Sequence, residues 1–432
     1  MQFLVEKFED LTVNKIQEII QKFETSNRIY LNRYKRYYDG NQDILRKQKT
    51  DEYKPCNRII TNYCYNIVSN YQGYIAGKDI VYSSADDIAE IQKILNYNDV
   101  SYEDSEFLKN ALIYGIAFEI MYLDADKMQR FKVVDSRECI PVYDNTLNQE
   151  LLAVIRYTPI DSIDASKGYS VEVYGANSVT YYTSSSNYSS LQFVEEQPHY
   201  FGQVPVVVFD LNSENKSIFD NVMTLQDAYN TLLSSEVDDF EAFCDAYLVL
   251  QGCTADEEDI ANMKKNRVLL LDADAKAEYL NKNISDTQIE NMLSNINDTI
   301  HKIANSPDFS QESFGTSSGI ALRYRLLGFE NCAGAIVKNM TKALQKRIEL
   351  ICAILNLVGG DEKWRDINII FTRNIPVDNM DAANMINLLR GLVSDKTLIA
   401  QLPFIDDPEQ EAKLIEEQNK TNASLYSFGE MQ

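Results

Sequence analysis

The sequence predicts an α+β protein in which a strand-rich part is followed by long amphipathic helices. After residue 221, apolar residues recur every three or four positions, which is the period of a helix. Before that point, six stretches are β-branched or alternate apolar and polar residues, a pattern typical of strands. These stretches are IAFEIMYL (116–123), RFKVVD (130–135), LLAVIRYT (151–158), YSVEVYG (169–175), SVTYYT (178–183) and VPVVVF (204–209).

The residues before these strands are expected to form helices of the same α+β unit, which spans residues 1–220. Ile16, Ile19, Ile20 and Phe23 recur at helical spacing. A further helix is expected over 57–76. A third, over 101–114, is followed by Gly115, a residue that readily adopts the left-handed conformation of a helix C-cap.

Two helices with a small insert between them are expected next. Apolar residues from 222 to 247 predict one helix of about 30 residues over 221–251, ended by Gly252. The second, over 285–305, has Ser285 as N-cap and Ile289, Leu293, Ile296, Ile300 and Ile303 on one side. The insert, 252–284, is expected to hold a short acidic helix (256–266) and two strands (267–274 and 275–282).

The longest predicted helix runs from Ser318 to Leu357 and ends before Gly359 and Gly360. At 1.5 Å per residue it would be about 60 Å long. Since that length exceeds a small domain, we expect neighbouring subunits of a large assembly to bury its apolar stripe. A strand over 366–376 and short helices then complete the chain.

Composition and charge exclude several classes of protein. The 432 residues carry a net charge of −24, with 65 acidic against 41 basic residues. This excess of acidic residues argues against a protein that binds DNA or an anionic membrane through a basic face. No apolar run approaches the length of a membrane span, and MQFLVEKFED lacks the basic start of a signal peptide. The seven scattered cysteines include no CxxC pair, which favours reduced thiols.

The sequence predicts no catalytic residue, no metal site and no cofactor, and therefore no enzyme. Its two histidines, His199 and His301, have no partner at metal-ligand or triad spacing, so each is expected to be structural or exposed. No phosphate-binding glycine loop is present. Adjacent acidic residues, as at Asp238-Asp239, would fan outward from a helix and are expected to be solvated.

Nine stretches, taken in order, resemble the portal proteins of tailed bacteriophages, in the branch typified by long non-contractile-tailed phages of Gram-positive hosts. They cover nearly the whole chain. The stretches are RYYDGNQDI (36–44), KPCNRIITNYCYNIVSNYQGYIAGKDIVY (54–82), YGIAFEIMYLD (114–124), DSRECIPVYDN (135–145), PVVVF (205–209), DAYNTLLSSEVDDFEAFCDAYLVLQG (227–252), SGIALRYRLLGFEN (318–331), FTRNIP (371–376) and LPFIDDPEQE (402–411).

The resemblance implies a portal-type fold and a ring oligomer of about twelve copies. It also implies a function: double-stranded DNA passes through the ring at one capsid vertex during packaging and ejection. The implied partners are the terminase motor, the head–tail connector, and the major capsid and scaffolding proteins. The implied location is the virion, with assembly in the host cytoplasm. The implied parts are an α+β wing (1–220 with strand 366–376), stem helices (221–251 and 285–305), a small α/β clip (252–284), a tunnel loop (306–318), a long channel-to-wing helix (319–358) and a short helical crown with the C-terminal tail (377–432).

Two groups of site residues follow from the resemblance. A partner-docking surface of the clip would be formed by Asp256, Glu257, Glu258 and Asp259. The tunnel loop facing the DNA would be formed by Asp308, Phe309, Ser310, Gln311, Glu312, Ser313, Phe314, Gly315, Thr316, Ser317 and Ser318. Without the resemblance, the sequence favours an ordinary connection between two helices. The main alternative function is an acidic oligomeric scaffold that does not contact DNA.

Overall fold

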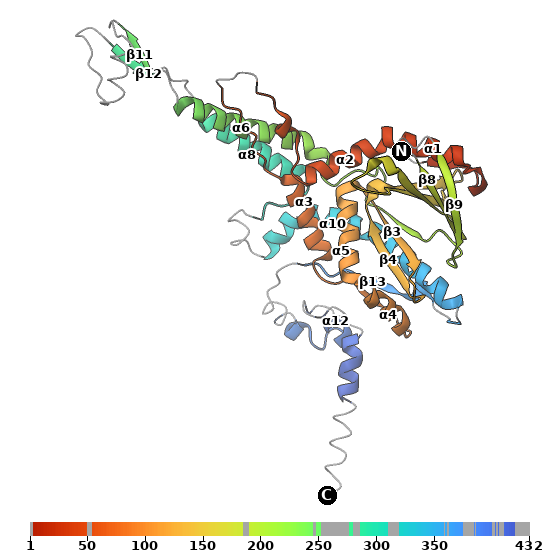
Figure 1. Ribbon diagram of the computed structural model, residues 1–432. Coiled ribbons are helices and arrows are strands. Elements are labelled where there is room, and N and C mark those ends of the chain that lie inside the picture. The colour runs from red at the N-terminus through yellow and green to blue at the C-terminus, as the bar shows by residue number, and fades with distance from the viewer. Residues whose placement is uncertain are drawn as a thin grey trace. The chain divides into compact units, whose positions relative to one another are not determined.

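The structure, a computed structural model of the 432-residue chain, divides into two compact units (Figure 1). Unit 1 comprises Met1–Lys35, Asn66–Asp220 and Phe309–Gln432, and unit 2 comprises Arg36–Tyr65 and Asn221–Asp308. The structure describes residues 3–49, 54–184, 190–244, 248–251, 276–279, 286–309, 319–357, 359–360, 363–374, 384, 386–399, 402, 405 and 410–419.

A six-stranded sheet in unit 1 has the strand order β1-β5-β6-β7-β8-β9. β1 pairs with β5 in parallel, and the other neighbours are antiparallel. The predictions of strands at β6, β7 and β8 are confirmed, whereas β1, β5 and β9 were not predicted. The strands are β1 (Phe3–Val5), β5 (Cys139–Asp144), β6 (Leu151–Pro159), β7 (Tyr169–Tyr174), β8 (Ser178–Ser184) and β9 (Leu191–Pro198).

One apolar cluster of unit 1 lies between this sheet and a three-stranded sheet. In the smaller sheet, β3 (Ile116–Leu123) pairs with β10 (Val206–Asp210) and β4 (Gln129–Val134). Alternate residues of β3 pack into one apolar cluster with residues of the larger sheet: Ile116, Phe118, Ile120, Cys139, Val154, Tyr174 and Val179. Because successive side chains of a strand point to opposite faces, Glu119 faces away from this cluster. Both faces of β3 are buried, which explains why its sequence is a nearly continuous apolar run.

Helices of unit 1 follow the predicted periodicity closely. α1 (Val13–Thr25) buries the four predicted apolar residues, and the side chain of Thr12 caps its first turn. α5 (Val100–Tyr114) ends at Gly115, whose φ of 81° confirms the predicted left-handed cap. The other helices are α2 (Asn27–Tyr38) and α3 (Tyr63–Ala76), which both extend into unit 2, and α4 (Ala89–Tyr97).

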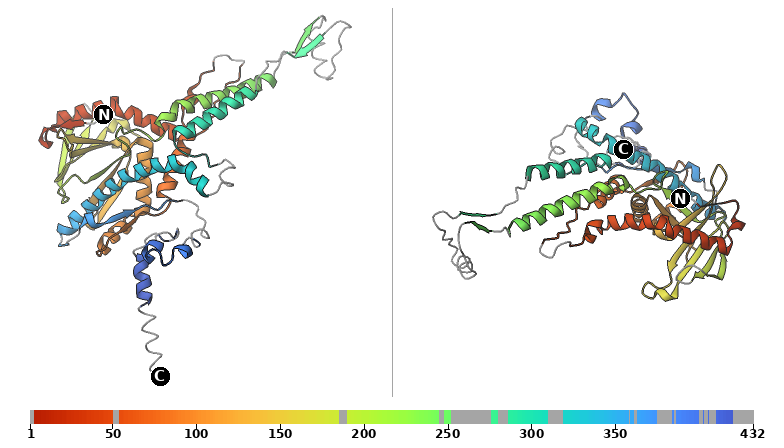
Figure 2. Two further views of the ribbon diagram at one scale, coloured as in Figure 1. Left: turned by 180° about the vertical axis from the view of Figure 1, so that it is seen from behind. Right: turned by 90° about the horizontal axis from the view of Figure 1, so that it is seen from above.

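The predicted long helix is confirmed as α10 (Gly319–Leu357), and Gly359 follows it with a φ of 102°. Figure 2 shows α10 running past the strands of unit 1. Our expectation that neighbouring subunits must bury its stripe is wrong between Leu326 and Cys352, because the same unit already buries the stripe there. The buried apolar residues are Leu326, Phe329, Ala333, Ile336, Met340, Ala343, Leu344, Ile348, Leu350, Ile351 and Cys352.

The strand predicted over 366–376 is shorter in the structure. β13 (Asn368–Ile370) pairs antiparallel with β2 (Val81–Ser83) and thereby joins unit 1. α12 (Asp395–Ile399) is the last helix with assigned bounds. Single 3-10 turns are η1 (Phe8–Asp10), η2 (Asp43–Arg46), η3 (Ser136–Glu138), η4 (Ala165–Lys167), η5 (Asp220–Val222) and η6 (Trp364–Asp366).

Unit 2 is built on two packed helices, α6 (Met223–Cys244) and α8 (Asp286–Ile303). The helix predicted over 285–305 is thereby confirmed within two residues. The helix predicted over 221–251 is wrong over its last four residues, because β11 (Leu248–Gln251) pairs antiparallel with β12 (Lys276–Tyr279). β12 lies within one strand predicted for the insert. The other predicted strand and the acidic helix lie outside the described residues.

The helix expected over 57–76 begins only at Tyr63, because residues 57–62 are extended and their backbone N–H groups bond to α6 instead. In the described part of the chain, no helix has the length and apolar character of a membrane span. Among the described cysteines, none forms a disulfide.

Candidate functional site

The structure describes the first four residues of the predicted tunnel loop, from Ser306 to Phe309. Residues Ser310 to Ser318 lie outside the described residues, as do Asp256 to Asp259 of the predicted clip surface. The position of these residues therefore stays a prediction. What the structure does show is how the start of the loop is held.

At its N-terminal end, the segment after α8 is held against that helix within unit 2. The backbone N–H of Ser306 donates to the carbonyl of His301 at 3.2 Å, and Nδ1 of His301 lies 2.8 Å from the carbonyl oxygen of Ser306. The imidazole ring also packs edge-on against Tyr63 with centroids 5.8 Å apart. Ser306 is fully buried. His301 therefore has a structural role, as the sequence indicated.

Phe309 in unit 1 lies against an aromatic cluster on α10. Its ring centroid is 6.4 Å from that of Phe329, in an edge-on arrangement. Phe329 is 1% exposed and packs at 4.6 Å from both Tyr71 and Tyr74 of α3. Half of Phe309 remains exposed. Edge-on aromatic pairs add stability beyond the area they bury, so this geometry anchors the chain at the start of the loop.

Three of the stretches that carry the resemblance meet beside this cluster. Glu330 accepts hydrogen bonds from the Tyr74 hydroxyl and from Nε and Nη2 of Arg373, the latter two at 3.1 and 3.0 Å. The backbone N–H of Asn374 donates to the carbonyl of Tyr74 at 3.2 Å. A Cβ at Gly77 would lie 2.1 Å from the carbonyl oxygen of Gly73 and 2.6 Å from Nδ2 of Asn374, so the backbone leaves no room there for any other residue.

A second polar cluster in unit 1 is buried completely and was missed by sequence reasoning. Arg347 of α10 donates to both carboxylate oxygens of Glu119 on β3, at 2.7 and 2.6 Å. It also donates to Asp104 of α5 and, at 2.9 Å, to the hydroxyl of Tyr82, which itself donates to Asp104 at 2.9 Å. Arg347 and Glu119 are 0% exposed, and Asp104 is 2% exposed. The available signal was a charged residue on the apolar stripe, three positions after Leu344.

Burial determines how these groups titrate. It raises the pKa of Asp104 and Glu119 above the usual range, although the hydrogen-bonded Arg347 partly offsets the effect. Burial alone would lower the pKa of Arg347, but the two carboxylates raise it well above the usual value. The guanidinium therefore stays charged and holds α10 to α5 and β3.

The polar side of α6 forms a ladder with the extended residues 57–63 of unit 2. Every second backbone N–H of the extended segment donates to every fourth side chain of the helix. Four residues of a helix rise about 6 Å and two residues of a strand about 6.6 Å, so the two repeats match over several steps. The four bonds are Asn57 N to Asp238 Oδ1 (2.6 Å), Ile59 N to Ser234 Oγ (2.9 Å), Thr61 N to Asn230 Oδ1 (3.0 Å) and Tyr63 N to Gln226 Oε1 (3.0 Å).

Further polar contacts fix this ladder. Gln42, which is fully buried, accepts from Asn230 and donates to Asn62 at 3.2 Å. The Tyr37 hydroxyl lies 2.9 Å from Asp43 and 2.8 Å from Asp227. The ladder joins three more stretches of the resemblance, 36–44, 54–82 and 227–252. Sequence reasoning placed the apolar positions of α6 in the core and missed this buried polar side.

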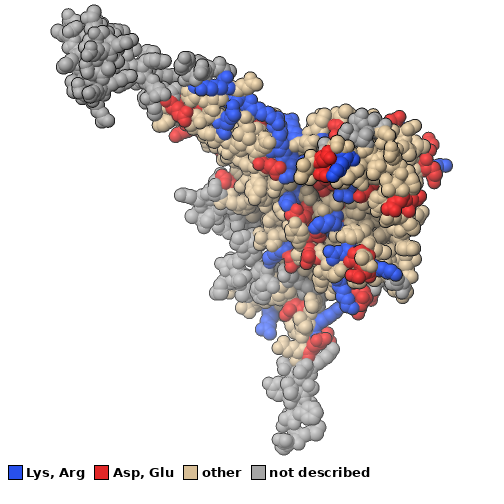
Figure 3. Space-filling model, in the orientation of Figure 1, with Lys and Arg blue, Asp and Glu red and all other residues tan. Residues whose placement is uncertain are grey.

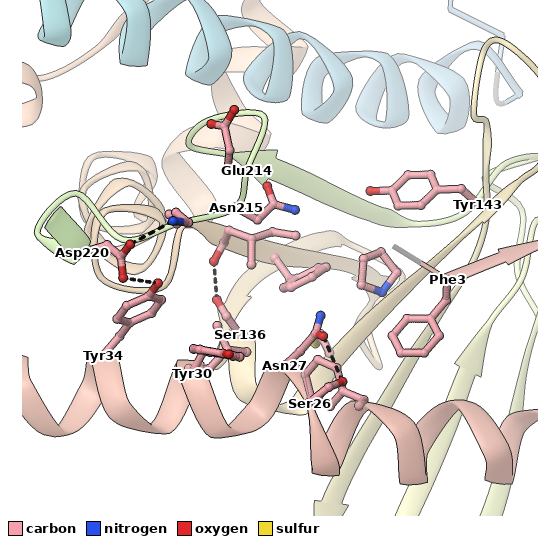
Figure 4. Close-up of a pocket in the computed structure, with 17 residues that line it drawn as sticks. Phe3, Ser26, Asn27, Tyr30, Tyr34, Ser136, Tyr143, Glu214, Asn215 and Asp220 are labelled. Carbon is pink, nitrogen blue, oxygen red and sulfur yellow. Dashed lines mark hydrogen bonds and ion pairs between the residues drawn. The ribbon is translucent and has the colours of Figure 1, made fainter. Parts of the chain in front are cut away.

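Unit 1 also contains a cavity of about 470 Å³ between α1, α2 and the sheets (Figure 4). Its interior is apolar and aromatic, with Phe3, Phe23 and Phe118 among the lining residues. The polar groups at its wall bond to one another: Tyr34 to Asp220 at 2.8 Å, and Ser136 to the carbonyl of Ile116 at 2.7 Å. Burial raises the pKa of the Cys139 thiol, which lines the cavity and stays protonated. This arrangement provides no activated nucleophile.

Comparison with known proteins decides the family. The family model described as "Phage portal protein, SPP1 Gp6-like" matches residues 17–425. The chain belongs to this portal protein family. It is 24% identical over 423 residues to the portal protein of Bacillus phage SPP1, covering 90% of this chain and 84% of that protein. It is 23% identical over 450 residues to the portal protein of Clostridium phage phiCD119, covering 96% and 98%. The resemblance inferred from the nine stretches is confirmed.

The family assignment covers both units of this portal protein. Its mixture of helices and sheets agrees with the predicted α+β class. Among the described residues, no group of three His, Cys, Asp or Glu side chains converges as a metal site would.

Proposed function

We propose that about twelve copies of this portal protein form a ring at one capsid vertex and that double-stranded DNA passes through the ring in packaging and ejection. The observation that carries this proposal is the family match over residues 17–425. The protein is a structural component of the virion, and its ring is assembled in the host cytoplasm. It acts by shape and charge, without an active site of its own.

The parts of the ring are assigned as the resemblance implies. Residues 1–220 with β13 form the wing, α6 and α8 the stem, 252–284 the clip, and 377–432 the crown. The pairing of β13 with β2 supports counting that strand with the wing. The packing of α6 on α8 and the β11–β12 ladder beyond them support a stem that carries a small clip.

The tunnel loop, 306–318, faces the DNA. Its described start is anchored by Phe309 on Phe329, and its remaining residues are small or neutral apart from Glu312. Each Lys or Arg bound to a phosphate would add affinity and slow a moving duplex. A lumen that is predominantly acidic, from a chain with a net charge of −24, would let DNA move in both directions.

The clip meets the terminase motor first and the head–tail connector later, while the wing meets the capsid and scaffolding proteins. Asp256, Glu257, Glu258 and Asp259 provide the acidic docking surface. Reversing the charge of Glu257 and Glu258 should weaken binding of motor or connector while rings stay intact. Loss of rings would instead mean that these residues are structural.

Electron microscopy of the purified full-length protein in negative stain tests the proposal. We expect rings with a central hole wide enough for a duplex. Assemblies without such a hole would support an acidic scaffold that does not contact DNA. A protein that stays monomeric under every assembly condition would overturn the ring.

Deletion of residues 310–317 tests the tunnel loop. The deletion should spare ring assembly and reduce the fraction of filled heads. A variant in which the same eight positions are replaced by Gly and Ser keeps the loop length. It therefore separates the effect of loop length on packaging from the effect of side-chain chemistry. Normal packaging by the deletion variant would rule out the loop assignment.

A further inference from the structure

Charge is segregated within unit 2. Residues 44–58 carry five basic side chains against two acidic ones, although the whole chain is strongly acidic. The two helices carry eight acidic residues and one lysine. The basic residues are Arg46, Lys47, Lys49, Lys54 and Arg58, and the acidic residues of the helices are Asp227, Glu236, Asp238, Asp239, Glu241, Asp286, Glu290 and Asp298.

The basic side of this unit is exposed. Arg46 is 62% exposed and forms a surface ion pair with Asp43 at 3.4 Å. Lys49 and Arg58 are also exposed. Figure 3 shows basic side chains gathered along one part of the surface beside α6. We refer to Arg46, Lys49 and Arg58 as the basic strip.

The basic strip is held in a fixed place. The ladder bonds residues 57–63 to α6, and Lys47 forms an ion pair with Asp238 at 2.8 Å. Ordered groups lose little conformational entropy when they bind a partner. The strip is therefore presented as a prearranged surface.

The acidic side is presented by α8. Glu290 and Asp298 are exposed, and within the described part of the chain neither forms a salt bridge. The two sets of charges thus lie on different elements of the same unit: the basic strip on η2 and the segments before α3, and the acidic pair on α8.

We propose that the basic strip of one copy pairs with Glu290 and Asp298 on α8 of the neighbouring copy. This inference rests on the ring of the proposed function. In a ring, every contact joins one surface of a subunit to a different surface of the next, so opposite charges on two separate elements of one unit favour pairing between neighbouring copies. Complementary charge also fixes the register and suppresses other pairings.

A second copy explains the strip better than nucleic acid does. The acidic helices lie next to the strip and would repel a polyanion, whereas they attract another copy of the same strip. Glu290 and Asp298 lie eight positions apart on α8, which is a rise of about 12 Å along the helix. Only a surface with several separated cations, such as the basic strip, can contact both carboxylates at once.

Three variants of the full-length protein test the pairing. K49E/R58E and E290K/D298K each place like charges at the proposed contact. The combined variant, K49E/R58E/E290K/D298K, restores complementarity with the signs exchanged. Mass photometry across a dilution series gives the concentration at which half of the protein is in rings, and circular dichroism verifies that each variant is folded.

Each reversal pair should raise that concentration about tenfold or more, and the combined variant should return it to within about threefold of wild type. The effect should shrink in 1 M salt, where the screening length falls to about 3 Å. K15E/K93E changes two exposed lysines of unit 1 and serves as the matched control, with no expected shift. K49Q/R58Q, which only neutralises the strip, should give a smaller shift.

If K49E/R58E formed rings at the wild-type concentration, the proposed contact would be overturned. The same would follow if the combined variant formed rings no more readily than either reversal pair. Either result would leave the ring itself in place. Reduced retention of a DNA duplex with unchanged assembly would assign the strip to nucleic acid and also overturn it. If wild type forms no ring, the proposed function fails as well, so the two failures are distinguishable.

Discussion

The Arg347 guanidinium and the Glu119 carboxylate form two parallel hydrogen bonds, Nε to Oε1 at 2.7 Å and Nη2 to Oε2 at 2.6 Å, with neither side chain exposed to solvent. Paired geometry of this kind combines strength with directional specificity. It fixes the rotation of α10 about its axis relative to β3, which apolar contacts alone would leave less sharply defined. Several measurable consequences follow from this and the other polar contacts.

Replacing Arg347 with Met should lower the free energy of unfolding by about 3–5 kcal/mol, because it leaves two buried carboxylates without their cation. Urea denaturation of the isolated chain measures the change. K93A, at an exposed lysine, is the control and should change stability by less than about 0.5 kcal/mol. In a double-mutant cycle, R347M/E119Q should cost less than the sum of the two single changes. Additive losses would contradict a direct pairing.

The pH dependence of stability should report the buried carboxyl groups. Burial raises the pKa of Asp104 and Glu119 in the folded state, so each contributes stability that is full below its unfolded-state pKa and is lost as pH rises through its folded-state pKa. E119Q removes one of these titrations. The free energy of unfolding of wild type, relative to E119Q, should therefore rise as the pH is lowered from neutral toward the ordinary pKa of a glutamate. Parallel pH profiles for the two proteins would argue against a raised pKa at Glu119.

Adjacent serines of α6 allow a matched test of the polar ladder. Ser234 is fully buried and accepts from the backbone N–H of Ile59 at 2.9 Å, whereas Ser235 is exposed. S234A leaves a buried donor unpaired and should cost about 1–3 kcal/mol. S235A should stay within about 0.5 kcal/mol of wild type. Hydrogen exchange at the Ile59 amide should accelerate in S234A alone, and equal exchange in both variants would count against the ladder.

Two glycines should respond to alanine in opposite directions. Gly115 has a φ of 81°, and a Cβ there would lie 2.4 Å from the backbone carbon of Asn215. G115A should therefore lower stability by about 2 kcal/mol or more. Gly334 lies inside α10 with no atom within 4 Å of the added Cβ, so G334A should raise stability by about 0.5–1 kcal/mol. Thermal unfolding measures both, and a destabilised G334A would mean that this helix needs a flexible point.

Local sequence patterns were sufficient to predict a helix or strand where one face of that element is apolar. The bounds of α10 and β3 and the cap at Gly115 followed from periodicity and turn chemistry, and they agree with the structure to within a residue. The family could also be inferred from ordered stretches of sequence, and the fold brings several of them into contact, as Tyr74, Glu330 and Arg373 show. The strand β9 escaped detection because nearly all of its residues are exposed, which removes the apolar signal.

By itself, the sequence determined the α+β class, the order of most helices and strands, and membership of the portal family, because these depend on residue spacing along one chain. Only the tertiary structure decided which polar residues are buried. Gln226, Asn230 and Ser234 would suit the solvent side of any helix, and Arg347 would suit a surface. Their burial depends on hydrogen-bond partners more than 160 positions away in the sequence. A backbone N–H or a carboxylate at that separation cannot be detected from the spacing of neighbouring residues.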